Sequence, residues 1–477
     1  MKQREARVRM TLVVAACAAM TACAALHPPA PVKLQLRGAA PIATPSNGTD
    51  ARWPTAQWWR DYDDPTLNTL VESAMAQAPE IASADARIRA AQQDVRLASA
   101  SLGLRADANA QFVRQRLSDN GLLPAKFLGF NWYDQSDLGI TVRYQFDWWG
   151  KQRAALEAAL DRSHARAAER RAAELGLAAA ISTTYFSWQT SAARMALQQE
   201  SIGILERQLL LTGRRADAQL DTVDATVAVR QDMATHREAL AVLRGQQQLQ
   251  VIALAALLGT DPMTLPEMTA RPLPRTAAAL PDDVGANLLA RRPDVAASRW
   301  RVEAALRDTD AARASFYPDV SLRALAGLSS IELGRLLRMD SGVPAAGIAV
   351  DLPLFDAGLR RARHGAAQAT LDVAIAAYDE AVVNAAREAG AAAAAIEQAT
   401  LQREQRTQQL AAAGTLMATA RARLSGQLTH IGPLLAASLR EIDLKDALLR
   451  VDLDALLADI QLKQALGGGP PIAATPQ

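Results

Sequence analysis

The chain has 477 residues, enough for two or three ordinary domains or for one large repeated architecture. Its 52 basic and 50 acidic side chains leave a formal net charge of +2, which gives no electrostatic reason to expect a nucleic acid partner. Aromatic residues make up only 4% of the chain and alanine dominates long stretches, so long helices are favoured over compact aromatic cores.

Residues 1–22 have the composition of a secretory signal peptide. Basic residues come first, and a small apolar segment runs from Met10 to Met20. Cys23 follows small residues, as in a bacterial lipobox, so we expect a diacylglycerol and an N-acyl lipid on Cys23 and no other cofactor. Cys17 is a competing site that leaves a shorter apolar segment. An ordinary cleaved signal with incidental cysteines is the remaining alternative.

Two segments without periodicity flank the rest of the chain. Residues 23–52 are rich in Pro, Ala, Gly and Thr and predict a lipid-anchored tether, and residues 469–477 predict a flexible tail. Both cysteines lie near the start, so no disulfide framework is expected. No later run of about 18 apolar residues predicts a transmembrane helix, so a membrane would have to be crossed by strands.

Long helices are predicted in two proline-free stretches, Ala125 to Asp261 and Leu354 to Gly432. Two segments carry apolar residues at alternating spacings of four and three, which is the pattern of a coiled-coil seam. The first seam comprises Val229, Met233, His236, Leu240, Leu243, Gln247, Gln250, Leu254 and Leu257. The second comprises Leu435, Leu439, Ile442, Asp446, Leu449, Leu453, Leu456 and Ile460. Helices packed lengthwise into bundles are therefore expected.

An internal repeat organises the chain. Ala78-Pro79-Glu80-Ile81 corresponds to Arg292-Pro293-Asp294-Val295, and Leu97 to Ser101 corresponds to Ala311 to Ser315 at the same offset. Gly150 and Arg153 similarly match Gly358 and Arg361. We therefore predict two repeats, residues 53–265 and 266–468, each with a shorter helix, a strand pair, a very long helix, a tight turn and a return helix.

Four segments alternate between apolar and polar residues, as strands with one apolar face do. The apolar sets are Ala106, Ala108, Ala110 and Phe112; Leu138, Ile140, Val142, Tyr144 and Phe146; Val320, Leu322, Ala324, Ala326 and Leu328; and Ile348, Val350, Leu352 and Leu354. Four strands are too few for a membrane barrel, whereas three copies supply twelve. From these patterns the predicted fold is mixed α and β, with long coiled-coil helices and four strands per protomer of a 12-stranded trimeric membrane β-barrel. A soluble sheet with one buried face is the alternative.

Several separated segments resemble the TolC/OprM outer-membrane factors, and among them the NodT-type lipoproteins. They are Leu289 to Val295, Ala314 to Val320, Leu352 to Ala362, Asp147-Trp148-Trp149-Gly150-Lys151 and Leu257 to Pro262. The resemblance covers roughly Trp53 to Gly468. It implies a homotrimer in outer-membrane lipid, with a 12-stranded outer-membrane β-barrel and a long α-helical coiled-coil tunnel in the periplasm. A periplasmic adaptor (membrane fusion protein) and an inner-membrane pump are the partners that it implies. The expected function is passive conduction of small toxic compounds or drugs to the exterior.

The family's periplasmic gate lies at the two helix-hairpin tips, which the resemblance places near Thr212 to Asp224 and Leu424 to Gly432. The candidate residues there are Asp217, Asp221, Asp224, Gly426, His430 and Gly432. Asp221 and Asp224 can cap free amides or, in a trimer, form acidic rings. Their equivalents in the second tip are Thr429 and Gly432, so an acidic constriction is not expected there. His430 is interpreted as a solvated turn residue, with pH sensing as the alternative.

No catalytic or metal-binding motif stands out. The five histidines are scattered, without a metal-ligand spacing, and no glycine-rich phosphate loop is present. The sequence therefore predicts a channel rather than an enzyme. A periplasmic coiled-coil adaptor or scaffold lipoprotein, a channel for type I protein secretion and a soluble periplasmic enzyme are the other readings.

Overall fold

A computed structural model describes Ala30 and residues 34–38, 53–118, 125–275, 281, 284–352 and 354–469. The predicted signal peptide, Cys17, Cys23 and most of the tether lie outside the described residues, as does the tail beyond Gly469. The lipid on Cys23 therefore stays a prediction. Among the described residues, no helix is both long enough and apolar enough to span a membrane.

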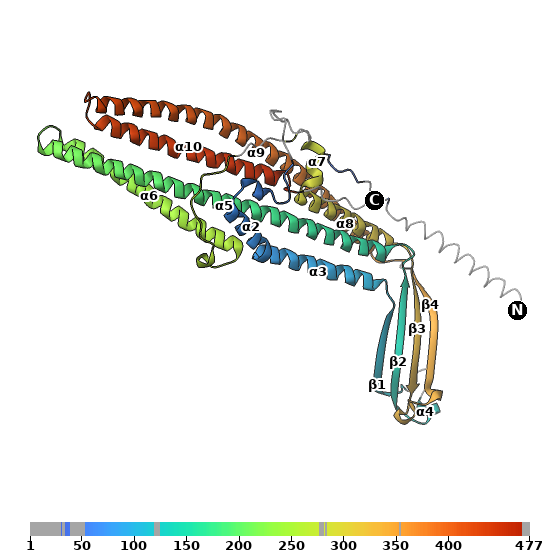
Figure 1. The fold of residues 1–477 in the computed structure, drawn as a ribbon. Coiled ribbons are helices and arrows are strands. Elements are labelled where there is room, and N and C mark those ends of the chain that lie inside the picture. The colour runs from blue at the N-terminus through green and yellow to red at the C-terminus, as the bar shows by residue number, and fades with distance from the viewer. Residues whose placement is uncertain are drawn as a thin grey trace. The chain divides into compact units, whose positions relative to one another are not determined.

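The elements follow the same order in the two halves of the chain (Figure 1). The first half contains η2 (Trp58–Tyr62), α2 (Pro65–Gln77), α3 (Pro79–Ser101), β1 (Arg105–Arg116), α4 (Ala125–Leu128), β2 (Trp132–Phe146), α5 (Lys151–Asp217), α6 (Val223–Leu258) and η3 (Pro262–Thr264). The second contains α7 (Val284–Arg291), α8 (Pro293–Ala314), β3 (Asp319–Ser330), η4 (Leu333–Arg335), η5 (Met339–Ser341), β4 (Gly342–Asp351), α9 (Leu359–Ser425) and α10 (Gly432–Ala465). The predicted plan of helix, strand pair, long helix, turn and return helix is confirmed.

Two compact units are built from segments of both halves. The first contains Arg89–Ala165 and Arg299–Ala377, and with them all four strands. The second contains the described residues within Arg37–Ile88, Arg166–Ser298 and Tyr378–Gln477, and with them both hairpin turns. The compact units therefore do not coincide with the sequence repeats, whose predicted boundary at residues 265 and 266 stays a prediction.

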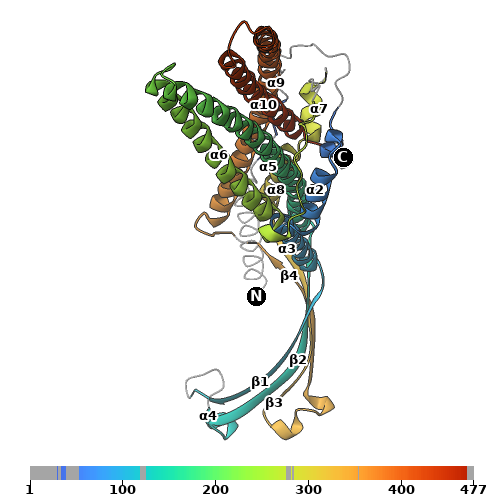
Figure 2. The same ribbon diagram turned by 60° about the vertical axis from the view of Figure 1, so that its left-hand side comes forward.

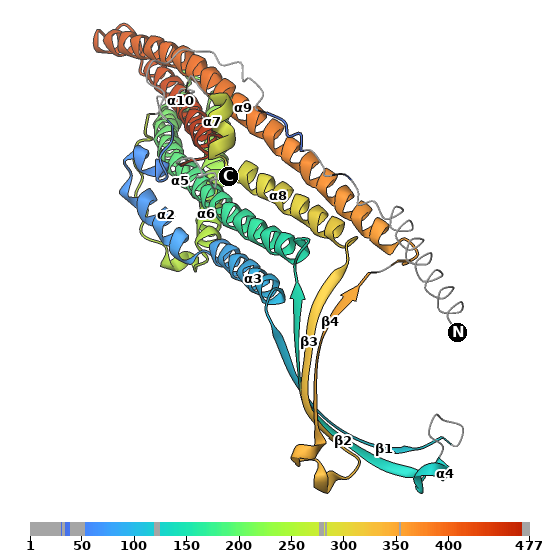
Figure 3. The ribbon, with the colours of Figure 1, turned by 90° about the vertical axis from the view of Figure 1, so that its right-hand side faces the viewer.

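The four strands form one antiparallel sheet in the order β1-β2-β3-β4 (Figures 1 and 3). Its register places the four predicted apolar sets on one face: Ala108 pairs with Ile140, Ile140 with Ala326, and Leu322 with Ile348. That face is open in this chain, since Ile140 and Ile348 are 52% and 71% exposed. One detail was wrong: β4 ends at Asp351, so Leu352 and Leu354 lie beyond the strand.

Helices α5 and α9 each have 67 residues, about 100 Å at 1.5 Å per residue. Both predicted seams are confirmed, because all their residues are buried or half-buried. Two of the three polar residues of the first seam have hydrogen-bond partners: His236 Nδ1 lies 2.7 Å from Gln198 Oε1, and Gln250 Nε2 donates to Ser191 Oγ at 3.2 Å. These bonds fix how α6 pairs with α5.

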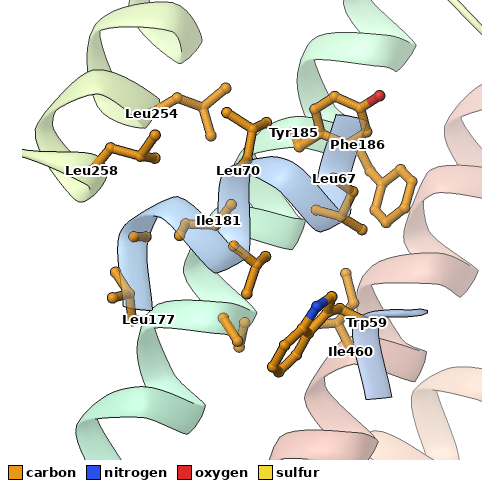
Figure 4. Close-up of a cluster of buried hydrophobic side chains, with 14 of the residues drawn as sticks. Trp59, Leu67, Leu70, Leu177, Ile181, Tyr185, Phe186, Leu254, Leu258 and Ile460 are labelled. Atoms are coloured by element: carbon orange, nitrogen blue, oxygen red, sulfur yellow. The ribbon is translucent and has the colours of Figure 1, made fainter. Parts of the chain in front are cut away.

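An apolar core joins α2, α5, α6 and α10 in the second unit (Figure 4). Leu67 and Leu70 of α2 are fully buried, and Ile460 of α10 is only 1% exposed. Asp64 starts α2 by accepting hydrogen bonds from the amides of Thr66 and Leu67 at 2.9 and 3.2 Å. The short helix α2 thus locks onto the long helices that carry the hairpin turns.

Candidate functional site at the helix-hairpin turns

The turn between α5 and α6 is a compact C-terminal cap. Gln219 has a φ of 57°, in the left-handed region. The amide of Leu220 donates to the Arg215 carbonyl at 2.8 Å, and the amide of Gln219 donates to the Ala216 carbonyl at 2.9 Å. This pair of bonds is the Schellman motif, which satisfies carbonyls that the end of a helix would otherwise leave free.

The turn between α9 and α10 repeats this geometry. Gln427 has a φ of 56°, and the amide of Leu428 donates to the Arg423 carbonyl at 2.9 Å. The amide of Gln427 donates to the Leu424 carbonyl at 3.0 Å. Both turns share the sequence Arg-x-x-x-Gln-Leu, a signal in the sequence that the apolar periodicity of the helices does not reveal. Figure 2 shows the two hairpins turning toward the same end of their unit.

The three predicted aspartates of the first turn are exposed and lie within a few residues of one another. Asp221 accepts a hydrogen bond from the amide of Thr222 at 3.1 Å, and its other oxygen lies 3.2 Å from Arg215 Nε. Thr222 holds the N-cap position of α6, and Asp224 lies in the first helical turn, where the helix dipole favours a carboxylate. Asp217 is the last residue of α5. Arg215 therefore offsets part of the acidic charge.

The second turn holds its predicted residues in a different arrangement. Gly426 donates its amide to the Ala422 carbonyl at 2.9 Å, and α10 begins at Gly432. A Cβ atom added to Gly432 would lie 2.8 Å from His430 Nε2, so this glycine makes room for the imidazole ring. His430 is exposed, as expected of a solvated turn residue. No acidic residue stands between Ser425 and Gly432.

Apolar side chains project from both turns. Leu220 and Leu428, at equivalent positions, are 67% and 79% exposed. Val223 and Ile431, which are also equivalent, are 73% and 37% exposed. Exposed apolar groups that recur at matched positions are typical of an interaction surface.

A buried ion pair joins the two hairpins. Asp446 of α10 is 5% exposed and accepts hydrogen bonds from Arg194 of α5 at 2.7 and 3.4 Å. Arg450 also donates to this carboxylate. Because the pair lies within the predicted seam of α10, it fixes the axial position of α10 relative to α5.

Arg292 and Asp294, which lie in the segment Leu289 to Val295 of the family resemblance, have a structural role. Arg292 is 6% exposed, and its guanidinium lies 2.6 Å from Asp294 and 2.8 Å from Glu388 of α9. The same guanidinium donates to the Ala465 carbonyl at the end of α10, at 3.1 Å. One arginine thus fastens the start of α8 to α9 and α10.

Two tyrosines hold polar networks beside the apolar core. Tyr185 donates to Asp64 at 2.9 Å and accepts from Gln189 at 2.8 Å, and burial, followed by the bond to Asp64, raises the pKa of Tyr185 to about 12. Tyr62 donates to Asp459 at 2.7 Å, and burial raises the pKa of both groups. Lys463 Nζ lies 3.5 Å from Asp459 and offsets part of that carboxylate's burial.

The part of the chain that the structure describes contains no cluster of acidic, histidine or cysteine side chains that could hold a metal ion. His164 packs against Trp300 with ring centroids 4.6 Å apart, and the buried His364 packs against Phe316 at 6.2 Å. His27 lies outside the described residues. The four histidines that the structure describes therefore have packing or turn roles.

The sequence profile of the family described as "Outer membrane efflux protein" matches residues 70–260 and 284–468. The multidrug resistance outer membrane protein MdtQ of Escherichia coli O6:H1 is 32% identical, over 76% of this chain and 81% of its own length. The solved structure of the outer membrane protein VceC from Vibrio cholerae has a TM-score of 0.79 and 29% identity, and covers 87% of this chain and 100% of its own. The outer-membrane channel OprN has the same fold, with a TM-score of 0.84 and 24% identity, over 93% of this chain and 99% of its own.

Proposed function

Because the chain belongs to the outer membrane efflux protein family, we propose that it works as a homotrimer that receives solutes from an inner-membrane pump through a periplasmic adaptor. Efflux through the outer membrane is its function, and that membrane is its location. The family is one of transporters, so we expect no catalytic activity. The energy for transport must then come from the pump.

The observation that carries the proposed trimer is the open sheet of the first unit. Strands β1 and β4 lie at its two edges, each with one neighbour among the described strands. Unpaired edge groups are very unfavourable in hydrocarbon, because no water is present to satisfy them. Three copies joined edge to edge give twelve strands and no free edge, with the apolar face toward lipid.

Tryptophans at both ends of β2 support a membrane-spanning orientation. Trp132 begins the strand, and Trp148 and Trp149 follow its end; these three side chains are 56%, 63% and 48% exposed. The 15 residues of β2 extend about 50 Å, or roughly 35 Å when tilted by 45°. Aromatic side chains so spaced fit the two interfaces of a bilayer.

The hairpin turns are the proposed docking site for the adaptor. Leu220, Val223, Leu428 and Ile431 supply apolar contacts on both turns. Asp217, Asp221 and Asp224 are the proposed gate residues of the first turn, and Gly426, His430 and Gly432 those of the second. In a trimer the first turn places acidic rings at the entrance, which favour cations, while the second turn adds no carboxylate.

The proposed cargo is small toxic compounds or drugs. It is supported by MdtQ, whose name assigns it to multidrug resistance. The proposed anchor is an acylated Cys23, which would hold the chain to the inner leaflet of the outer membrane. Acylation adds to membrane attachment, whereas spanning rests on the strands.

Two experiments test these proposals. With Cys23→Ala, the mature protein should still require detergent for extraction and should elute as a trimer; a monomer that stays in solution without detergent would refute the channel. Deletion of the gene should sensitise cells to members of a broad toxicity panel, and wild-type protein should restore resistance. If the deletion strain and its parent have the same sensitivity to every compound, the drug-efflux assignment is wrong.

A further inference from the structure

Three arginines stand side by side on the face of the sheet opposite the apolar one. Arg105 of β1 pairs directly with Arg143 of β2, and Arg143 pairs directly with Arg323 of β3. All three side chains belong to exposed residues. Directly opposite residues on neighbouring strands have Cα atoms about 5 Å apart, so three guanidinium groups share one row.

The row lacks matching negative charge. No ion pair or hydrogen bond involves any of the three guanidinium groups within the described ranges. Asp107, two residues along β1 from Arg105, is the one carboxylate at a neighbouring position on this face. Gly347 continues the row on β4 and adds no side chain. The row therefore keeps an excess of positive charge.

The next carboxylates on this side of the sheet lie four residues further along the chain, about 13 Å away, at the end of a strand or just beyond it. They are Asp147, Asp319 and Asp351. Asp147 pairs with Arg153 at 3.4 Å, and Asp319 pairs with Lys151 at 3.5 Å. Two of the three are thus engaged with other cations and do little to balance the arginine row.

Like charges placed directly opposite on neighbouring strands destabilise a sheet. A role limited to folding would be served better by uncharged polar residues or by an acidic partner. Guanidinium groups bind phosphate and carboxylate oxygens in a planar, two-pronged geometry that few other side chains provide. Their alignment in one row suits a ligand with several negative oxygens.

We propose that Arg105, Arg143 and Arg323 form an anion-binding band on the water-facing side of the channel, for solutes that carry several phosphate or carboxylate groups. This inference rests on the proposed trimer, in which three copies of the row would encircle the pore. A ring of arginines attracts and holds anions as they pass. The band would give the strand region a preference opposite to that of the acidic first hairpin turn.

The test uses the full-length trimer in detergent and inorganic tripolyphosphate as the probe, with binding measured by titration calorimetry. Wild-type protein should bind, and R143Q should bind at least about tenfold more weakly. R143K keeps the charge but loses the two-pronged geometry, so it should bind with an affinity between those of wild type and R143Q. R114Q is the matched control: it removes the same charge from β1, but on the opposite face, where Arg114 lies 3.7 Å from Asp134. R323Q, which should also weaken binding, gives a second reading if R143Q does not fold.

The outcomes separate the band from the proposed function. A trimer that does not bind tripolyphosphate, or one in which R143Q and R114Q weaken binding equally, overturns the band and leaves the channel intact. A wild-type chain that stays monomeric in detergent overturns the trimer and the band together. Binding that is independent of salt concentration would also contradict an ionic site, because added salt screens such contacts.

Discussion

Asp446 places a carboxylate in a helix seam that is otherwise apolar. Its side chain is 7% exposed and that of its partner Arg194 is 21% exposed. Removing one partner of such a pair lowers the free energy of unfolding by more than the pair itself contributes, because the other charge is then buried alone. The pair therefore fixes the alignment of α10 against α5 more than it adds to the free energy of unfolding.

We expect Asp446→Ala to lower the free energy of unfolding by about 3 kcal/mol, because it leaves the Arg194 guanidinium without its buried partner. Urea titration followed by circular dichroism measures this loss. The double variant Arg194→Met with Asp446→Leu should recover to within about 1 kcal/mol of wild type, since two apolar residues can fill the same space. If the double variant is as unstable as the single one, the charges themselves supply stability and this interpretation is wrong.

Tyr185 makes the stability of the protein depend on alkaline pH. Its pKa is raised from 10.0 to about 12, so the folded state holds the phenol proton more tightly than the unfolded state does. The resulting stabilisation is complete below pH 10 and is lost as the pH rises from 10 to 12. Two pKa units correspond to about 2.7 kcal/mol, an order-of-magnitude figure.

Tyr185→Phe should remove this dependence. The difference in free energy of unfolding between wild type and variant should be constant from pH 7 to 10 and should shrink by about 2 kcal/mol toward pH 12. Denaturant titrations at intervals of one pH unit measure the trend. The pH trend can be assigned to Tyr185 because the basic residues are mostly arginines, which stay charged from pH 7 to pH 12. A constant difference up to pH 12 would contradict the assignment.

At the scale of elements, each hairpin turn contains a glutamine with a positive φ angle. Gln219 and Gln427 adopt left-handed backbone conformations, which cost a residue with a side chain about 1 kcal/mol relative to glycine. The presence of glutamine at both positions, despite that cost, is consistent with a role for the two side chains at the hairpin turns.

Gln427→Gly should therefore stabilise the second turn by about 1 kcal/mol. Hydrogen exchange of the amides between Arg423 and Leu435 measures this local effect, and exchange there should slow. The matched control is Gln408→Gly at an exposed position within α9, where the same substitution should destabilise the helix by about 1 kcal/mol. Faster exchange in the Gln427→Gly protein would mean that the glutamine side chain itself holds the turn.

Sequence periodicity predicted the elements well, because strand alternation and seam spacing are local patterns. The ends of strands were less accurate: β1 extends to Arg116, and β4 stops at Asp351 although the apolar alternation continues to Leu354. Which residues face each other across strands depends on register, which the alternation of a single sequence does not fix. The arginine row therefore emerged only from the paired strands. The shared Arg-x-x-x-Gln-Leu is present in the sequence, but its role as a turn emerged only from the backbone angles.

At the scale of the whole molecule, the sheet edges make a prediction about assembly. Strands β1 and β4 run antiparallel to each other, because each neighbour in the order β1-β2-β3-β4 reverses direction. A closed ring therefore pairs β1 of one copy with β4 of the next in an antiparallel, head-to-tail contact. Such a contact joins two different surfaces, so it continues from copy to copy until the ring closes.

Paired cysteines can detect this contact, since the sequences of the four strands contain no native cysteine. We expect Ala108→Cys on β1, combined in turn with Ala346→Cys, Ile348→Cys or Val350→Cys on β4, to yield a covalent trimer for the combination that matches the register. The matched pair should bring Cα atoms to about 5.5 Å, within reach of a disulfide. Non-reducing gels of oxidised membranes measure the product.

Single-cysteine variants should stay uncrosslinked, because neither edge strand meets its own copy. Cross-linking that stops at two copies would indicate a symmetric dimer, and the absence of any product across the series would show that the edges do not meet.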